Sequence, residues 1–206
     1  RGEKFDRLTP GKAKEQGMTM VYQEFNLIPE MTVYENLFVG KEIRSGVFVD
    51  KKAMLKQSRD IFREMEVDVD CNAKIKDISV AYCQLVEIAK ALLEESRLLI
   101  LDEPTAPLTT KEITILFRVL QKLKKKGISM IYISHRLEEI FELCDRISVL
   151  RDGEYITCLN VRDTNKEELI KLMIGRELFQ ELPKRLMEVD YDQEEPVLKV
   201  KNLTHP

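Results

Sequence analysis

Two adjacent carboxylates are the first candidates for chemistry: Asp102 and Glu103, which follow four apolar residues and precede Pro104. The apolar run, residues 98–101, predicts a short strand buried on both faces, as in the middle of a parallel sheet. Open α/β sheets bind ligands at the carboxyl ends of such strands. Because successive strand residues face opposite sides, we expect one acid to hold a hard cation such as Mg²⁺ and the other to point at a water. The alternative is a strand end with two solvated acids.

Two further polar residues are candidates for the same edge of the sheet. Gln23 follows a predicted strand at 18–22, where a side-chain amide can meet a metal ion or a water. His135 follows a largely apolar strand at 128–133 and precedes a predicted helix. Taken alone, Gln23 is most simply a surface residue. His135 taken alone is equally consistent with a structural residue beside a helix cap and with a catalytic group.

Strands and helices alternate in the second half of the chain. A helix over about 79–94 leads into the strand at 98–101, and a helix that begins with a Thr109–Glu112 capping box leads into the strand at 128–133. This order predicts right-handed βαβ crossovers and a parallel sheet, hence an α/β fold.

Residues 32–90 carry helical patterns in place of strand signals. Thr32 and Glu35 have the spacing of a capping box, and Asp50 is predicted to cap a helix that runs through Met65. We therefore expect a mainly helical subdomain inserted into the α/β core.

Two more elements are predicted after the sheet. The Asp152-Gly153 pair lies between two apolar runs and indicates a β-hairpin with a type I′ turn. Thr164 and Glu167 are predicted to cap a last helix, which ends at Gly175.

The composition sets limits on the class of protein. Charged residues make up 33% and apolar residues 44% of the 206 positions, which is typical of a globular protein. The net charge of −3 gives no support for nucleic-acid binding. No apolar run approaches ~20 residues and no secretory signal opens the chain, so no segment is expected to cross a membrane. The four cysteines show no C-x-x-C spacing, which favours free thiols over disulfides or a metal site.

Taken in order, these motifs resemble those of the ATP-binding subunits of ABC transporters, particularly the tandem-domain ATPases of bacterial monosaccharide importers. Residues 21–29 resemble the Q-loop, 98–105 the Walker B strand with its Asp-Glu-Pro-Thr ending, and 133–137 the switch-histidine segment. Residues 106–109 lie where the D-loop belongs, and the helix at 79–94 lies where the signature motif belongs.

The resemblance implies an ABC-type P-loop NTPase core with ATP and Mg²⁺ as cofactors. Gln23 and Asp102 would bind Mg²⁺, Asp102 through a water. Glu103 would be the general base that polarises the attacking water, and His135 would contact the γ-phosphate. Ser79 would offer its hydroxyl and a helix N-terminus to the nucleotide bound by the opposite ATPase domain.

The resemblance also implies partners and a location. The implied partners are membrane permease subunits, a second ATPase domain and, indirectly, a sugar-binding protein, but no nucleic acid. The implied location is the cytoplasmic face of the cell membrane. Gln23 would transmit the nucleotide state by moving the helical subdomain, whose exposed face would dock on the permease. Val33, Tyr34, Leu37 and Phe38 are more apolar than a freely solvated helix needs, which favours such a face, although core packing explains some of them.

Domain boundaries follow from the same resemblance and from composition. Residues 1–175 are expected to be a first ABC ATPase domain without its amino end. Residues 176–196 hold three basic against seven acidic residues and two prolines, which indicates a linker. Residues 197–206 are expected to start a second ABC ATPase domain.

Two departures from the family pattern bear on activity. The signature, close to Leu-Ser-Gly-Gly-Gln in the family, is Ile-Ser-Val-Ala-Tyr here, so that Ala81 and Tyr82 replace residues of the pattern. No G-x-x-x-x-G-K-[ST] phosphate loop occurs in the sequence. We therefore expect the chain alone to be inactive and its parent protein to be the ATPase.

Two alternatives stay open. One is an ABC-fold interaction module that does not hydrolyse ATP; the altered signature favours it, whereas intact Asp102, Glu103 and His135 count against it. The other is an ABC ATPase outside transport, in DNA repair or translation, which would be expected to carry a basic groove or a long coiled coil.

Overall fold

The structure, a computed structural model, describes residues 7–94 and 96–175. These residues divide into two compact units. The first holds the chain up to Ile147 together with Cys158–Asp163, and the second holds Ser148–Thr157 and the chain from Thr164 onward. The predicted linker and second domain, 176–206, lie outside the described residues.

A three-stranded parallel sheet forms the centre of the first unit. Its strands are β1 (Met18–Val21), β4 (Leu98–Asp102) and β5 (Ser129–Ile133), in the order β1-β4-β5. Both pairings are parallel. The predicted α/β fold with a parallel sheet is therefore confirmed, and β4 is its central strand.

Only one face of this sheet is fully covered by the described residues. Leu99 and Leu101 of β4 are 0% exposed, whereas Ile131 and Ile133 on the opposite face of the neighbouring β5 are 48% and 44% exposed. The expectation that strand 98–101 is buried on both faces is thus wrong for the structure as described. The physical reason is that the helices described here pack against the Leu99 and Leu101 face.

Two long helices cover that face. They are α4 (Val80–Leu93) and α5 (Thr110–Lys125), whose buried residues recur at helical spacing. Phe117 of α5 packs edge-on against Tyr132 of β5, with ring centroids 6.4 Å apart. The predicted Thr109–Glu112 capping box is present at the start of α5.

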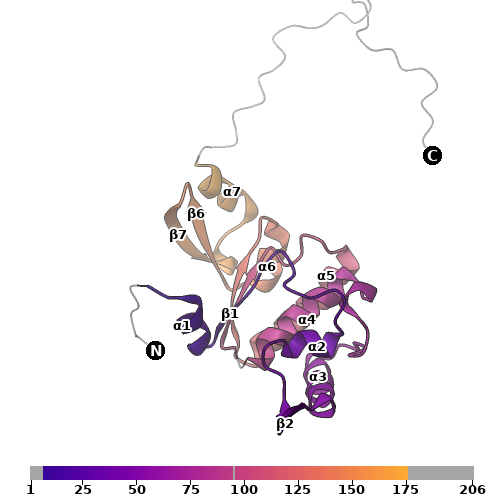
Figure 1. Cartoon of the computed structure of the whole chain (residues 1–206). Helices are drawn as coiled ribbons and strands as arrows, with labels where there is room; N and C mark the ends of the chain where they lie inside the picture. The colour runs from indigo at the N-terminus through magenta and orange to yellow at the C-terminus, as the bar shows by residue number, and fades with distance from the viewer. Residues whose placement is uncertain (1–6, 95, 176–206) are drawn as a thin grey trace, which may run out of the picture. The chain divides into compact units, whose positions relative to one another are not determined.

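The segment between β1 and β4 is mainly helical, as predicted (Figure 1). Beside α4 it contains α2 (Val33–Phe38), α3 (Lys51–Met65) and a 3₁₀ turn, η1 (Ile75–Asp77). Thr32 and Glu35 form the predicted capping box, and Asp50 caps α3 by accepting a hydrogen bond from the Ala53 N–H. The sequence did not reveal a small hairpin, β2 (Arg44–Ser45) and β3 (Phe48–Val49).

The apolar surface of this segment differs from the expected one. Val33, Tyr34, Leu37 and Phe38 are all buried, between 0% and 7% exposed, so core packing fully accounts for them. The most exposed apolar side chains of this segment belong to the hairpin instead, where Val47 is 85% and Phe48 is 76% exposed. The four α2 residues therefore cannot form a docking face.

The remaining elements complete the two units. They are α1 (Pro10–Glu15), α6 (Leu137–Leu143), β6 (Arg146–Arg151), β7 (Glu154–Asn160), η2 (Val161–Asp163) and α7 (Lys166–Ile174).

The β6–β7 hairpin turns as predicted, with Asp152 and Gly153 both at positive φ (53° and 80°). The cap of α7 is Asn165, which accepts a hydrogen bond from the Glu168 N–H, and not Thr164, because Thr164 hydrogen-bonds the Glu168 side chain. None of the four cysteines, all of which lie in the described residues, forms a disulfide. No helix in the described part of the chain is long and apolar enough to cross a membrane.

Candidate nucleotide site

Asp102 and Glu103 diverge at the carboxyl end of β4. Asp102 is the last residue of the strand, pairs in register with Ile133 and is half-buried. Glu103 leaves the strand with φ 47°, in the left-handed region, while its N–H still donates to the Ile133 carbonyl at 3.0 Å. This turn directs the Glu103 side chain toward the segment that follows β5.

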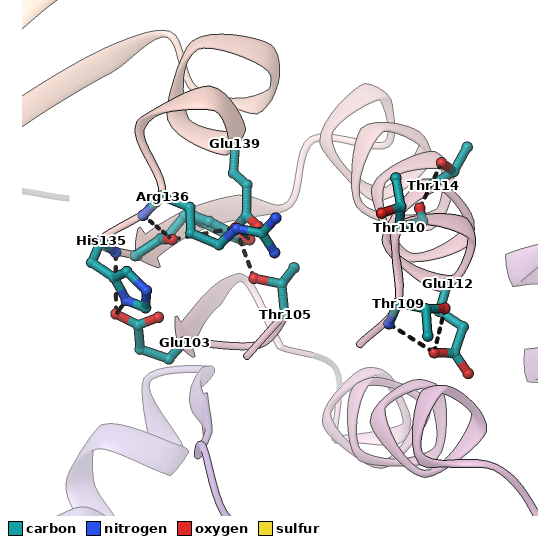
Figure 2. A network of polar contacts seen from close by, with 11 residues as sticks. Glu103, Thr105, Thr109, Thr110, Glu112, Thr114, His135, Arg136 and Glu139 are labelled. Atoms are coloured by element: carbon teal, nitrogen blue, oxygen red, sulfur yellow. Dashed lines mark hydrogen bonds and ion pairs between the residues drawn. The ribbon is translucent and has the colours of Figure 1, made fainter. Parts of the chain in front are cut away.

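Glu103 and His135 form a pair there (Figure 2). His135 Nδ1 lies 2.9 Å from Glu103 Oε1, and the His135 backbone N–H donates to the same oxygen at 3.1 Å. Since an ionised carboxylate only accepts hydrogen bonds, the proton of this contact belongs to Nδ1. The His135 side chain is 73% exposed, and that of Glu103 is 19% exposed. The histidine ring is thus oriented by Glu103 yet open to a ligand.

The second oxygen of Glu103 is left for another partner. Oε2 is buried, and no described residue hydrogen-bonds it. A buried oxygen in this state calls for a water or an ion that satisfies it. This is what a carboxylate that receives a proton from an attacking water would require.

Gln23 lies at the same edge of the sheet. Val21, the last residue of β1, pairs with Leu101, so β1 and β4 end side by side, and Gln23 follows two residues later as an exposed residue. Gln23 and Asp102 offer an amide oxygen and a carboxylate, ligand types suited to Mg²⁺. The described residues contain no group of three or more acidic, histidine or cysteine side chains that could form a metal cage. Mg²⁺ does not need one, because it is commonly held by one or two carboxylates, waters and phosphates.

Ser79 lies apart from this pair, at the N-cap of α4. Its side chain is exposed and does not cap the helix, and Ser79 Oγ lies 3.5 Å from Glu112 Oε1 of α5. The hollow beside it has a volume of about 50 Å³, far below the ~300 Å³ or more of a ligand pocket. Ala81, which replaces a glycine of the family pattern, is only 7% exposed and lines this hollow together with Ser79.

A buried cluster next to the Glu103–His135 pair was missed by sequence reasoning. Glu139 of α6 is 4% exposed. Its Oε2 accepts hydrogen bonds from Thr105 Oγ1 at 2.8 Å, Tyr132 OH at 2.7 Å and Ser134 Oγ at 3.2 Å. Its Oε1 pairs with Arg136 Nη1 at 3.0 Å. The signal that could have revealed it is spacing: Glu139 shares a helix face with Leu143, which is also buried.

The fold and the site together define an α/β protein with polar residues gathered where parallel strands end, the position of ligand sites in open α/β sheets. Among solved structures, the ADP conformation of MJ1267, an ATP-binding cassette of an ABC transporter, has the same fold. It matches with a TM-score of 0.66 at 23% identity, over 81% of this chain and 72% of that one.

The family follows from sequence. The family model described as ABC transporter matches residues 2–106, half of the chain, so the chain belongs to the ABC transporter family. It is 41% identical over 203 residues to a galactose/methyl galactoside import ATP-binding protein, MglA, of Yersinia pestis bv. Antiqua (strain Antiqua), covering 98% of this chain and 39% of that protein. The MglA of Sodalis glossinidius (strain morsitans) is 43% identical over 94% of this chain and 37% of its own length. The chain thus spans less than half of these relatives.

Proposed function

We propose that this chain belongs to the ATP-binding subunit of an ABC importer for a monosaccharide. In this proposal residues 1–175 belong to a first ATPase domain, 176–196 to a linker and 197–206 to a second ATPase domain. The similarity to galactose/methyl galactoside import proteins supports the substrate class.

The observation that carries the proposal is the Glu103–His135 pair. Glu103 polarises the attacking water and accepts its proton, with one oxygen fixed by His135 and the other still unpartnered among the described residues. General base catalysis of this kind contributes typically ~10²–10⁴-fold in rate. His135 contacts the γ-phosphate with its exposed ring and so helps to hold it in line with the water.

Gln23 and Asp102 fit the Mg²⁺ that accompanies ATP. Asp102, through a water, and Gln23 would hold Mg²⁺, which supplies positive charge to neutralise the phosphates. The 206 residues contain no G-x-x-x-x-G-K-[ST] loop, whose backbone N–H groups and lysine cradle phosphates in this class. We therefore place tight nucleotide binding in the full-length subunit.

The proposed partners use different surfaces. Ser79, exposed at the N-terminus of α4, faces the nucleotide of a second ATPase domain. The exposed apolar residues of the helical segment, among them Ile28, Met31 and Phe48, form the surface for a membrane permease at the cytoplasmic face of the cell membrane. A sugar-binding protein acts through that permease and does not touch this chain.

The test is ATP turnover by the full-length subunit assembled with its permease in vesicles, with and without galactose and its binding protein. We expect turnover that requires Mg²⁺ and rises with the sugar-loaded binding protein. ATP binding without turnover in the assembled transporter would overturn the proposal in favour of a non-hydrolysing module, the alternative raised by the altered signature.

A further inference from the structure

We propose that Glu139 is a positioning residue that sets the geometry of the Glu103–His135 pair. Its carboxylate ties the segment after β4 to the segment after β5, the two segments that carry these side chains. The inference rests on the proposed function, because the pair matters only if it acts on a water and a phosphate.

On the β5 side, Glu139 holds residues on both sides of His135. Ser134 Oγ donates to Glu139 Oε2 at 3.2 Å, and Arg136 Nη1 lies 3.0 Å from Glu139 Oε1. Ser134 Oγ also accepts the Arg136 backbone N–H at 3.0 Å. His135 therefore sits in a short turn whose two flanking residues are fixed to one carboxylate. Its backbone N–H, which contacts Glu103, is fixed with them.

On the β4 side, the contact is Thr105, two residues after Glu103. Thr105 is 0% exposed and donates to Glu139 Oε2 at 2.8 Å. Figure 2 shows Thr105 and Arg136 directed toward Glu139 from two different segments, with Glu103 and His135 meeting beside them. Because Glu103 has a left-handed backbone at the end of its strand, the chain that follows it must be held in place, and the Thr105 bond does this.

A fourth contact anchors the cluster to the sheet. Tyr132 of β5 donates its hydroxyl to Glu139 Oε2 at 2.7 Å. Burial, together with this hydrogen bond to Glu139, raises the pKa of Tyr132, so that the phenol keeps the proton it donates. One oxygen thus accepts from three hydroxyls of three separate positions. Because these three donors share one acceptor, removal of the Glu139 carboxylate releases all three at once.

A purely structural reading makes a different prediction. If Glu139 only supported folding, its loss would lower the amount of folded protein without changing turnover per folded molecule. If Glu139 positions the pair, its loss lowers kcat while KM for ATP changes little. The reason is that Glu139 does not itself contact the residues proposed to hold Mg²⁺ or the phosphates. A misplacement of about 1 Å can cost on the order of 10²-fold in rate.

The first experiment compares variants of the full-length subunit in the assembled transporter. Glu139→Ala is expected to lower kcat, normalised to folded protein, by about 10–100-fold with KM within about threefold. Thr105→Val, nearly isosteric, should lower kcat in the same direction and keep the subunit folded. Glu139→Gln keeps an acceptor oxygen and should recover part of the rate. Ser96→Ala is the matched control: Ser96 is 7% exposed and hydrogen-bonds Thr19 and the Ala91 carbonyl near the start of β4.

The second experiment needs no turnover. The sequence holds two histidines, His135 and His205, so ring ¹⁵N spectra of the 206-residue chain are simple to assign with a His205→Asn variant. We expect His135 protonated on Nδ1 in the wild type, as its contact with Glu103 requires, and a loss of that signature in Glu139→Ala and Thr105→Val but not in Ser96→Ala.

The outcomes separate the two ideas. Wild-type kcat and an unchanged Nδ1 signature in both Glu139→Ala and Thr105→Val would overturn the positioning role. A wild-type subunit that shows no turnover, but whose Nδ1 signature depends on Glu139, would overturn the proposed function and leave the geometric inference standing.

Discussion

Replacement of Glu103 by glutamine separates the shape of this side chain from its charge. The glutamine oxygen can accept the same two hydrogen bonds from His135, at 2.9 and 3.1 Å. A hydrogen bond to a charged group contributes ~1.5–3 kcal/mol and a neutral one ~0.5–1.5 kcal/mol. Because His135 is 73% exposed, solvent screening reduces that difference. We expect Glu103→Gln to change the free energy of unfolding by about 1 kcal/mol or less.

The effect on turnover should be much larger. An amide cannot accept the proton of the attacking water, so the ~10²–10⁴-fold contribution of the base is lost, equivalent to ~3–5 kcal/mol of activation free energy. The assay is ATP turnover by the full-length subunit with its permease, alongside binding of labelled ATP. Binding should stay near the wild-type level. Full turnover in Glu103→Gln would refute the assignment of the base.

A double-mutant cycle with His135→Ala sharpens the test. If Glu103 and His135 act as one unit, the double variant should be about as slow as the slower single variant. If they act independently, the two effects should multiply. Multiplicative effects would contradict the interpretation of the 2.9 Å contact as a functional pair.

Three further outcomes are expected. The purified 206-residue chain, titrated with labelled ATP and Mg²⁺, should show no saturable micromolar binding, because it has no phosphate loop. Saturable micromolar binding would contradict the inference that these residues lack the groups needed to hold the triphosphate. Thr32→Ala should lower the free energy of unfolding by about 1 kcal/mol in urea titrations. Hydrogen bonds from the Thr32 backbone N–H and side chain lower the pKa of Glu35, so their stabilisation is present above pH 4.5 and is lost as the pH falls through the lowered pKa. Thr32→Ala removes the side-chain bond and keeps the backbone bond, so the variant should lose only slightly less stability on acidification than the wild type; a larger loss than in the wild type would contradict this assignment. Val47→Asp with Phe48→Asp should weaken binding to the permease in pull-down assays without unfolding the chain, since both side chains are exposed; Glu64→Ala, on exposed surface, serves as the control, and unaffected binding would place the docking surface elsewhere.

The sequence pattern was sufficient for the elements that depend on local chemistry. Thr32, Asp50 and Thr109 each cap the predicted helix, because a short polar side chain before an apolar periodic run has few other uses. The strand ends that carry Asp102 and His135 could be found because apolar runs bounded by polar residues define strands in parallel sheets.

The features that escaped prediction depend on contacts between distant segments. The Glu103–His135 hydrogen bonds join residues 32 positions apart, and composition does not specify them. Glu139 was missed because a glutamate in the first turn of a helix is normally read as favourable to the helix dipole. The exposure of Phe48 was missed because a hairpin with two residues in each strand has too little periodicity to detect.

The left-handed backbone at Glu103 has a consequence for protein engineering. A non-glycine residue in that conformation costs on the order of 1–3 kcal/mol, and asparagine or glycine would adopt it with less strain. A selection for thermostability alone should therefore favour those two residues at position 103. Such variants would have a higher melting temperature but would lack the carboxylate. The φ angle at position 103 therefore sets thermal stability against catalysis.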